Sequence, residues 1–365
     1  DGCVELFCGN LPWSVDDDKI ADMFLKSRIS EEVHTDLRAM LEEVRYPLAV
    51  RSSSLLEDSH LQPFAGVYST FMLPNNDPSI RVRLRQLRRA IKLVYASTFF
   101  TGARAYMQAM HHRIEEEKMG VLVQRLVGTD FGERFYPTFS GVAQSYNYYP
   151  VRYMKPEDGI AHVALGLGRT VVSGGRALRF SPSHPQVLPQ MGTPEEALRA
   201  SQRRFFALDM TEPRAHITSD EEATLRNPDL SVAEADGVLR WLGSTFDGSQ
   251  GRVHDHIDRP GSRLVTFAPI LKHGAFPLAE ILADLLATGR EAMGCPVDME
   301  FAVNIDPTGA ERPEFAVLQI RPLSTMDVAV EVELDGVDDR EPRLRTARAL
   351  GNGVLRDIED IVYVP

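Results

Sequence analysis

Four polar residues near the end of the sequence are spaced so that together they could hold a metal ion and a phosphate group. Asp298 and Glu300 lie two positions apart on one predicted strand, and Gln319 and Arg321 lie two apart on the next. Because alternate residues of a strand share a face, antiparallel pairing would bring two carboxylates, an amide oxygen and a guanidinium together. Such a group suits Mg²⁺ and an arginine that neutralises phosphoryl charge. A polar, solvent-facing strand pair explains the same pattern equally well.

A second polar segment follows the short apolar run at residues 48–50. Arg51 comes at the end of this predicted strand, Ser52 and Ser53 begin a hydroxyl-rich turn, and Gly66 belongs to a small-residue loop further on. Such a loop can aim backbone N–H groups and hydroxyls at phosphate oxygens, while the arginine supplies a planar, permanent charge. Serine-rich turns after strands are common, so these residues alone favour an ordinary turn over a phosphate site.

The elements that would position these residues are a mixture of helices and strands. Helices are predicted over 15–25, 31–44 and 80–98, and from 194 and 277 onward, with Ser30 and Thr193 as caps of two of them. Strands are predicted at 121–123, 139–143, 160–164, 299–303 and 315–320, and a loop rich in Ser, Gly and Pro at 52–79. This pattern indicates the α+β class.

Composition narrows the classes of function. The 365 residues suffice for two or three domains or subdomains. The net charge of −12 argues against a nucleic-acid binder, but a few arginines in one cleft could still hold a nucleotide. No apolar run is long enough to span a bilayer, so we expect no membrane partner. The cysteines, at positions 3, 8 and 295, fit no disulfide or zinc pattern and indicate a cytoplasmic protein. The sequence begins at Asp1, and we expect the natural N-terminus to lie upstream.

Six ordered motifs resemble the nucleotide-binding domain of the phosphoenolpyruvate synthase and pyruvate phosphate dikinase family. The longest is YPLAVRSSSLLEDSHLQPFAGVYSTFM, which is similar to the family's AVRSS strand, acidic pair and FAG turn. The others are GVLVQ at 120–124, SGV at 140–142, LGLG at 165–168, VDMEFAV at 297–303 and LQIRPL at 318–323. The resemblance implies an ATP-grasp fold, with mixed or antiparallel sheets, flanking helices and two lobes around a nucleotide cleft.

The resemblance also implies how the chain is divided. Residues 46–325 would form the dikinase-type nucleotide-binding domain, preceded by a helical lead-in at 1–45. Residues 326–365, which include the acidic stretch 331–341, would be a linker or the start of a following segment.

Each matching residue takes an implied role around bound Mg·ATP. Arg51 would contact the ATP phosphates, Arg321 would stabilise the transferred phosphoryl group, and Arg104 would lie near the phosphates. Gln124 would border the adenine. The residues that would form a lid over the phosphates are Ser52, Ser53 and Gly66. Two further side chains, those of Glu300 and Gln319, would coordinate Mg²⁺, and that of Asp298 would support them or contact the ribose.

Three departures from the family pattern bear on activity. The family's phosphate-binding lysine, in a Gly-rich N-terminal segment, has no match before Arg45, so we expect the chain to begin downstream of it. The turn that reads GLGE in the family has Arg169 in place of the acid. The phosphohistidine motif of the swivelling domain is not found. The histidines that lack its context, and are predicted to be ordinary surface or core residues, are His111, His112, His254 and His256.

The leading hypothesis is a phosphotransferase module that binds Mg·ATP and transfers phosphate to a histidine on another domain of the same or another chain. Such a module would not complete turnover alone. A degenerate, nucleotide-sensing module that binds a partner is the first alternative, and an ATP-grasp ligase is the second. Pyruvate, a glucan, an antibiotic hydroxyl and a protein all remain open as the final acceptor.

Overall fold

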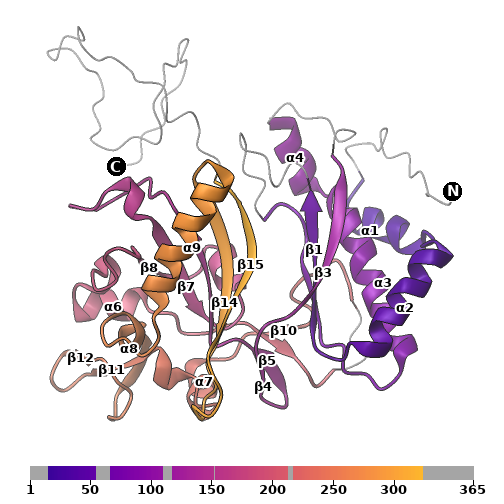
Figure 1. Cartoon of the computed structure of the whole chain (residues 1–365). Coiled ribbons are helices and arrows are strands. Elements are labelled where there is room, and N and C mark those ends of the chain that lie inside the picture. Colours follow the sequence, from indigo (N-terminus) through magenta and orange to yellow (C-terminus); the bar gives the residue numbers. More distant parts are fainter. Residues whose placement is uncertain (1–14, 55–65, 110–116, 152, 213–216, 324–365) are drawn as a thin grey trace, which may run out of the picture.

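The computed structural model describes residues 15–54, 66–109, 117–151, 153–212 and 217–323. The acidic pair and the start of the FAG turn within 55–65, the histidines at 111 and 112, and the predicted segment at 326–365 lie outside the described residues. Two lobes stand side by side, with the strands β14 and β15 of one lobe facing β1 and β3 of the other (Figure 1). None of the helices in the described part of the chain combines the length and hydropathy needed to cross a membrane.

The smaller lobe packs helices against a three-stranded antiparallel sheet of order β2-β1-β3. Its strands are β1 (Leu48–Ser54), β2 (Phe71–Leu73) and β3 (Met119–Arg125). Its helices are α1 (Asp17–Lys26), α2 (Glu31–Glu43), α3 (Ile80–Ser97) and α4 (Thr101–Ala109). Leu41 of α2, Val50 of β1 and Leu87 of α3 are buried in one apolar core, so the first helices pack together with the sheet.

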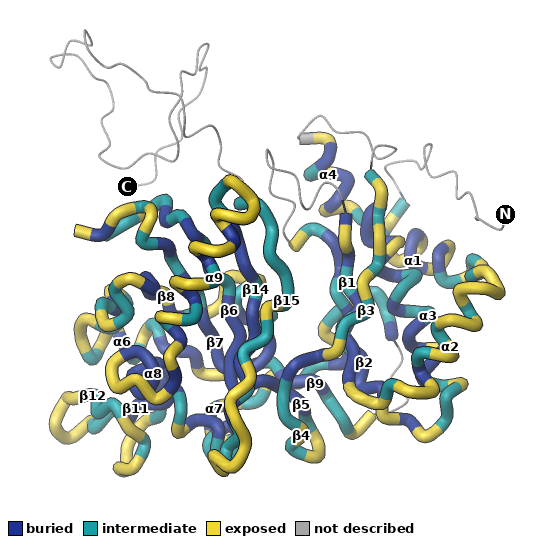
Figure 2. The backbone as a smooth tube through the Cα atoms, in the orientation of Figure 1, coloured by how far each residue is buried: buried dark blue, intermediate teal, exposed yellow. Residues whose placement is uncertain are grey.

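The larger lobe is built on a five-stranded antiparallel sheet of order β15-β14-β6-β7-β8. Its strands are β6 (Phe139–Gln144), β7 (Ile160–Leu165), β8 (Leu178–Phe180), β14 (Val297–Asn304) and β15 (Glu314–Pro322). One face packs against α9 (Leu278–Met293), which buries Leu282 and Leu286. The strands β6, β7 and β14 are accordingly mostly dark in the burial view (Figure 2), and the opposite face of the sheet looks toward the smaller lobe.

Two small antiparallel sheets and several short helices complete the larger lobe. One sheet has the order β10-β9-β5-β4 and contains β4 (Thr129–Asp130), β5 (Arg134–Tyr136), β9 (Ala207–Asp209) and β10 (Leu225–Arg226). The other has the order β12-β11-β13 and contains β11 (Gly243–Asp247), β12 (Arg252–His254) and β13 (Ser262–Val265). The short α-helices are α5 (Arg169–Val172), α6 (Pro194–Ala200), α7 (Leu230–Ala235) and α8 (Ala268–Leu271). The short 3-10 helices are η2 (Pro156–Asp158), η3 (Pro189–Met191) and η4 (Leu239–Trp241).

Local sequence signals account for several element boundaries. Ser30 caps α2 by accepting a hydrogen bond from the Val33 backbone N–H at 3.3 Å, as predicted. Thr193 and Glu196 form the predicted capping box at α6, each side chain accepting from the other residue's N–H. The first helix begins later than predicted, at residue 17, because Asp16 accepts from the backbone of the first turn.

The prediction of a loop over 52–79 is wrong in two places. Strand β1 does not end at Arg51 but continues to Ser54, because residues 52–54 pair in register with residues 119–121 of β3. A further strand, β2, then pairs with the start of β1. The apolar triplet at 71–73 was the local signal for β2. Three residues are too few to show an alternating pattern, and the Gly, Ser and Pro residues around them favour a loop.

Candidate functional site

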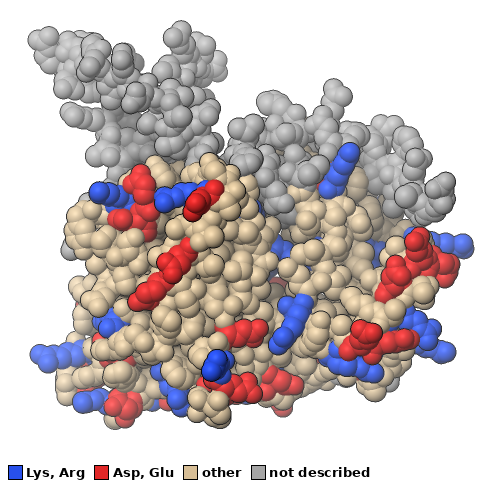
Figure 3. All heavy atoms as spheres, in the orientation of Figure 1, with Lys and Arg blue, Asp and Glu red and all other residues tan. Residues whose placement is uncertain are grey.

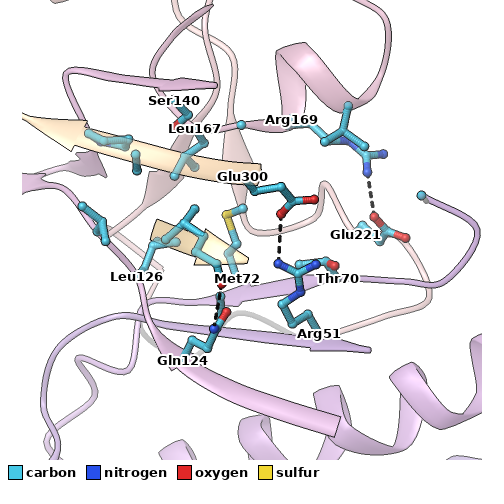
Figure 4. A pocket seen from close by; sticks show the side chains of 18 of the residues that line it. Arg51, Thr70, Met72, Gln124, Leu126, Ser140, Leu167, Arg169, Glu221 and Glu300 are labelled. Carbon is cyan, nitrogen blue, oxygen red and sulfur yellow. Dashed lines mark hydrogen bonds and ion pairs between the residues drawn. The ribbon is translucent and has the colours of Figure 1, made fainter. Parts of the chain in front are cut away.

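Arg51 joins the two lobes across a cavity of about 190 Å³. Its Nη1 donates to Oε2 of Glu300 at 3.0 Å, and its Nη2 donates to Oε1 of Gln319. In Figure 4 the guanidinium of Arg51 and the carboxylate of Glu300 point toward one another from opposite walls. The side chains in this ion pair are only 15% and 22% exposed, so water screens their attraction less than at an open surface.

The strand that carries Asp298 and Glu300 (β14) pairs antiparallel with the strand that carries Gln319 and Arg321 (β15). Asp298 lies directly opposite Arg321, and Glu300 lies directly opposite Gln319. Opposed residues of antiparallel strands share a face, so all of these side chains belong to the face that looks into the cavity. A β-bulge follows: the register shifts after Glu300 and leaves Leu318 as the extra residue.

Asp298 and Arg321 form a nearly water-free ion pair at this site. Nε and Nη2 of Arg321 both donate to Oδ2 of Asp298, at 3.0 and 2.7 Å, and the side chains are 12% and 6% exposed for the arginine and the aspartate. Burial raises the pKa of Asp298, and the positive charge of Arg321 opposes that rise. The carboxylate therefore orients the guanidinium, which lines the cavity beside Glu300.

The inner end of the cavity is apolar. Ala49 of β1 lies opposite Met72 of β2 and Gln124 of β3, so these three side chains form one row across the small sheet. The apolar side chains that line this end together with Ala49 and Met72 are Leu126, Val127, Leu167, Ala302 and Leu318. Such a slot suits a flat, apolar ring with a few polar edges.

Gln124 also ties the lobes together, because its Nε2 donates to the backbone carbonyl of the bulged Leu318 at 3.3 Å. The apolar lining of the cavity was not predicted from the sequence. Ala49 could have been found, since it lies two residues before Arg51 on the same strand and must share its face.

The rim of the cavity carries the charge that departs from the family pattern. Arg169, where the family has an acid, donates to Glu221 at 2.7 Å and to Glu222 at 3.2 Å. The Arg169–Glu221 pair is visible at the edge of the pocket in Figure 4. Gly66 lines the same rim and has a φ of 73°, a conformation that glycine adopts without strain. The two glutamates lie on an irregular segment far away in sequence, and no periodic signal identified them.

The positive charge of Arg169 at the rim of the cavity can be tested by substitution. Reversing this charge with Arg169→Glu would place a third carboxylate against Glu221 and Glu222, so we expect an anionic ligand of the cavity, such as a nucleotide, to bind roughly tenfold more weakly. The double variant with Glu221→Arg should recover most of the loss, and isothermal calorimetry would measure both. Equal affinities of the single variant and the unmodified chain would show that the rim charge is irrelevant to binding.

Three of the predicted site residues lie away from the cleft. Ser52 is a buried residue within β1, and Ser53 is the exposed residue that alternates with it. Arg104 is buried in α4, where its Nη2 donates to the Val15 carbonyl at 2.9 Å and approaches the Thr101 hydroxyl at 3.4 Å. The structure thus brings Arg51, Gly66, Gln124, Asp298, Glu300, Gln319 and Arg321 around one cleft and places these three elsewhere.

The donor set at Glu300 and Gln319 fits a magnesium ion. The oxygens of both side chains converge on the guanidinium of Arg51, so they already hold a positive charge between them. Among the described residues no group of three or more His, Cys, Asp or Glu could form a metal cage. This agrees with the usual way Mg²⁺ is held, by one or two protein oxygens together with substrate phosphates.

Comparison with known proteins identifies the domain type. The family described as "Pyruvate phosphate dikinase, AMP/ATP-binding domain" matches residues 14–341. An uncharacterized phosphotransferase of Bacillus subtilis (strain 168), YvkC, is 29% identical over 153 residues. That alignment covers 41% of this chain and 16% of the Bacillus protein, so the chain matches only a small part of its relative.

Proposed function

Because the chain belongs to the pyruvate phosphate dikinase AMP/ATP-binding domain family, we propose that its interlobe cleft binds Mg·ATP and passes a phosphoryl group to a histidine on another domain. The observation that carries the proposal is the convergence of Arg51, Glu300, Gln319 and Arg321 across the cleft. Few arrangements other than a polyphosphate site need two guanidinium groups beside two convergent oxygen ligands.

The two ends of the cleft would bind different parts of the nucleotide. The adenine lies in the apolar slot between Met72 and Leu126, with Gln124 at its polar edge. The phosphates lie at the charged end, where Arg51 leaves its carboxylate partner to contact them. Arg321 faces the phosphoryl group that is transferred, and Asp298 keeps that guanidinium in place.

Glu300 and Gln319 would hold the magnesium ion. When bound, this ion neutralises charge on the phosphate oxygens and orients the terminal phosphates for in-line attack. The chain's own residues fix the phosphates with guanidinium groups and exclude water by bringing the lobes together. An incoming imidazole nitrogen then forms its bond to phosphorus as the bond to the leaving phosphate oxygen breaks, and the nucleotide keeps that electron pair.

We propose that the acceptor histidine belongs to a phosphohistidine-type domain of the same or another chain, so that the module does not complete turnover alone. Residues 46–325 would be the catalytic nucleotide-binding unit. A cytoplasmic location is also proposed, and it is supported by the few, unpatterned cysteines.

Filling the adenine slot should test the binding mode. An Ala49→Leu substitution adds bulk to the row that it shares with Met72 and Gln124, so we expect the affinity for Mg·ATP to fall at least about tenfold. The matched control is Ala275→Leu, at an exposed position outside the cleft. Isothermal calorimetry with Mg·ATP would compare the variants, after thermal denaturation has shown that both are folded. Unchanged affinity in the cleft variant would count against this binding mode, and no heat with the unmodified chain would count against the proposed function.

One observation favours the alternative, a degenerate module that senses a nucleotide. Arg169 stands where the family has an acid, and it is paired with Glu221 and Glu222. Labelled ATP separates the two functions. Transfer of the β- or γ-phosphate to a histidine in the full-length protein would reject the sensing role, and tight binding without any transfer would support it.

A further inference from the structure

A row of side chains runs across the five-stranded sheet from the cleft to its far edge. Gln319 lies opposite Glu300, Glu300 opposite Val142, Val142 opposite His162, and His162 opposite Arg179. Directly opposed residues share a face, so the histidine and the last arginine look toward the same side of the sheet as the metal-ligand pair. At the usual strand spacing they lie roughly 10 and 14 Å from Glu300 along the sheet.

Two cavities lie along this row and lead away from the nucleotide cleft. The first, of about 500 Å³, has Glu300 and Arg321 at one end and His162 and Arg179 at the other. The second, of about 450 Å³, shares His162 and Arg179 with the first and is also lined by Asn147, Tyr149 and Met154. The cavities therefore form one trough that begins where the terminal phosphates would lie.

The second cavity is shaped for an apolar body. Its main apolar and aromatic lining residues are Tyr148, Tyr149, Val151, Met154, Ile160 and Phe180. Tyr149 is 54% exposed at this site, so its ring is accessible to a ligand in the cavity. Among the residues the structure describes, none of those lining this cavity is an Asp or a Glu.

At the end of the trough formed by His162 and Arg179, the described residues supply no paired counterion. Within the described ranges, no side chain forms a hydrogen bond or an ion pair with the guanidinium of Arg179 or with the imidazole of His162. The backbone N–H of Arg179 donates to Gln190 at 2.7 Å, which fixes this end of β8. Burial, followed by the nearby charge of Arg179, lowers the pKa of His162, so this imidazole is neutral near pH 7.

The half-buried imidazole of His162 makes stability depend on pH in a predictable direction. The unfolded chain takes up a proton at this histidine near its ordinary pKa of 6.5, whereas the folded chain resists protonation until the pH is lower. The free energy of unfolding should therefore decrease as the pH falls below about 6.5, and His162→Gln should remove that part of the decrease. Urea denaturation of both proteins at several pH values would measure it. Parallel pH curves would show that the histidine does not titrate in this way.

We propose that the trough is a second ligand site, which binds a small molecule with an aromatic ring and an anionic group. The ring lies in the aromatic cavity against Tyr149, and the anion contacts the Arg179 guanidinium and accepts a hydrogen bond from the His162 imidazole. The ligand thus occupies the side of the sheet next to the terminal phosphate, a placement that rests on the proposed nucleotide function. The two cavities of the trough and their lining residues do not depend on that proposed function.

Phenyl phosphate is the probe, titrated calorimetrically into the full chain. We expect saturable binding that weakens at least about tenfold in Arg179→Gln, because a charge-assisted contact is lost. The matched control is Arg176→Gln, which removes an exposed arginine three residues away that does not line the trough. Tyr149→Ser should weaken phenyl phosphate binding but not methyl phosphate binding, since only the former has a ring. Benzoate in place of phenyl phosphate shows whether a carboxylate serves as well.

Repeating the titration with saturating Mg·ATP separates this site from the nucleotide cleft. Continued binding that still depends on Arg179 supports two sites. Binding that ATP abolishes and that Arg179→Gln leaves unchanged overturns the proposal, as does no saturable binding at millimolar probe. If the chain does not bind ATP but its binding of phenyl phosphate still depends on Arg179, the second site is supported and the proposed nucleotide function is rejected.

Discussion

An Arg321→Met variant should lose both phosphoryl transfer and about 3–5 kcal/mol of folding stability. The stability loss arises because Asp298, whose side chain is only 6% exposed, would keep its carboxyl group buried without a counterion. The activity loss is expected because Arg321 is the guanidinium that we propose to face the transferred phosphoryl group, where Asp298 holds it. We expect transfer in the full-length protein to fall by roughly 10³-fold, the lower range for a transition-state arginine.

A double variant separates these two effects. Asp298→Asn combined with Arg321→Met removes the buried charge together with its partner, so most of the stability should return while transfer stays absent. Urea denaturation and labelled-phosphate transfer are the two measurements. Recovery of transfer in the double variant would show that the arginine acts only by neutralising the aspartate. Full activity in a folded single variant would remove Arg321 from the proposed mechanism.

An Arg51→Met variant should change metal binding and catalysis in opposite directions. The guanidinium occupies the oxygens of Glu300 and Gln319, so its removal frees both donors and should tighten the binding of free Mn²⁺, used as a probe for Mg²⁺. The same change removes a phosphate contact, and we expect transfer to fall by roughly 10²- to 10³-fold. Electron paramagnetic resonance measures the free Mn²⁺, and labelled ATP measures the transfer.

The control for this variant is Arg240→Met, which removes an arginine that stacks on Trp241 at 4.8 Å and does not line the cleft. It should leave both measurements unchanged. Weaker Mn²⁺ binding in Arg51→Met would mean that the arginine holds the two oxygens in a useful arrangement and does not compete with the metal. That result would also weaken the assignment of Glu300 and Gln319 as a magnesium site.

Strand periodicity predicted the charged end of the cleft because its geometry is local. Two pairs of residues with a spacing of two, on strands that are neighbours in sequence, leave little freedom once the strands pair. The α+β class followed from the mixture of predicted helices and strands, and the family fold from six motifs, of which two lie on these strands. The mixture of acidic and basic side chains over both lobes in Figure 3, by contrast, gives no indication of where the cleft lies.

The parts that could not be predicted depend on contacts between distant segments. Arg104 is a buried arginine that donates to the carbonyl of Val15, which lies 89 positions earlier in the sequence. Ser52 lies within a strand because β3, about 70 residues later, pairs with it. Glu221 reaches the rim from an irregular segment whose path depends on the fold as a whole.

The bulge at Leu318 adds one residue to the wall of the cleft without changing which face its neighbours occupy. Before the bulge, Phe315 pairs with Val303 and stacks on Phe301 with ring centroids 5.1 Å apart, on the core side of the sheet. After it, Gln319 and Arg321 face the cleft. Deleting Leu318 would restore plain alternation and leave Phe315, Gln319 and Arg321 on the faces they now occupy. What the deletion would remove is an apolar side chain of the cavity lining and the carbonyl that accepts from Gln124, so we expect it to weaken ligand binding more than folding.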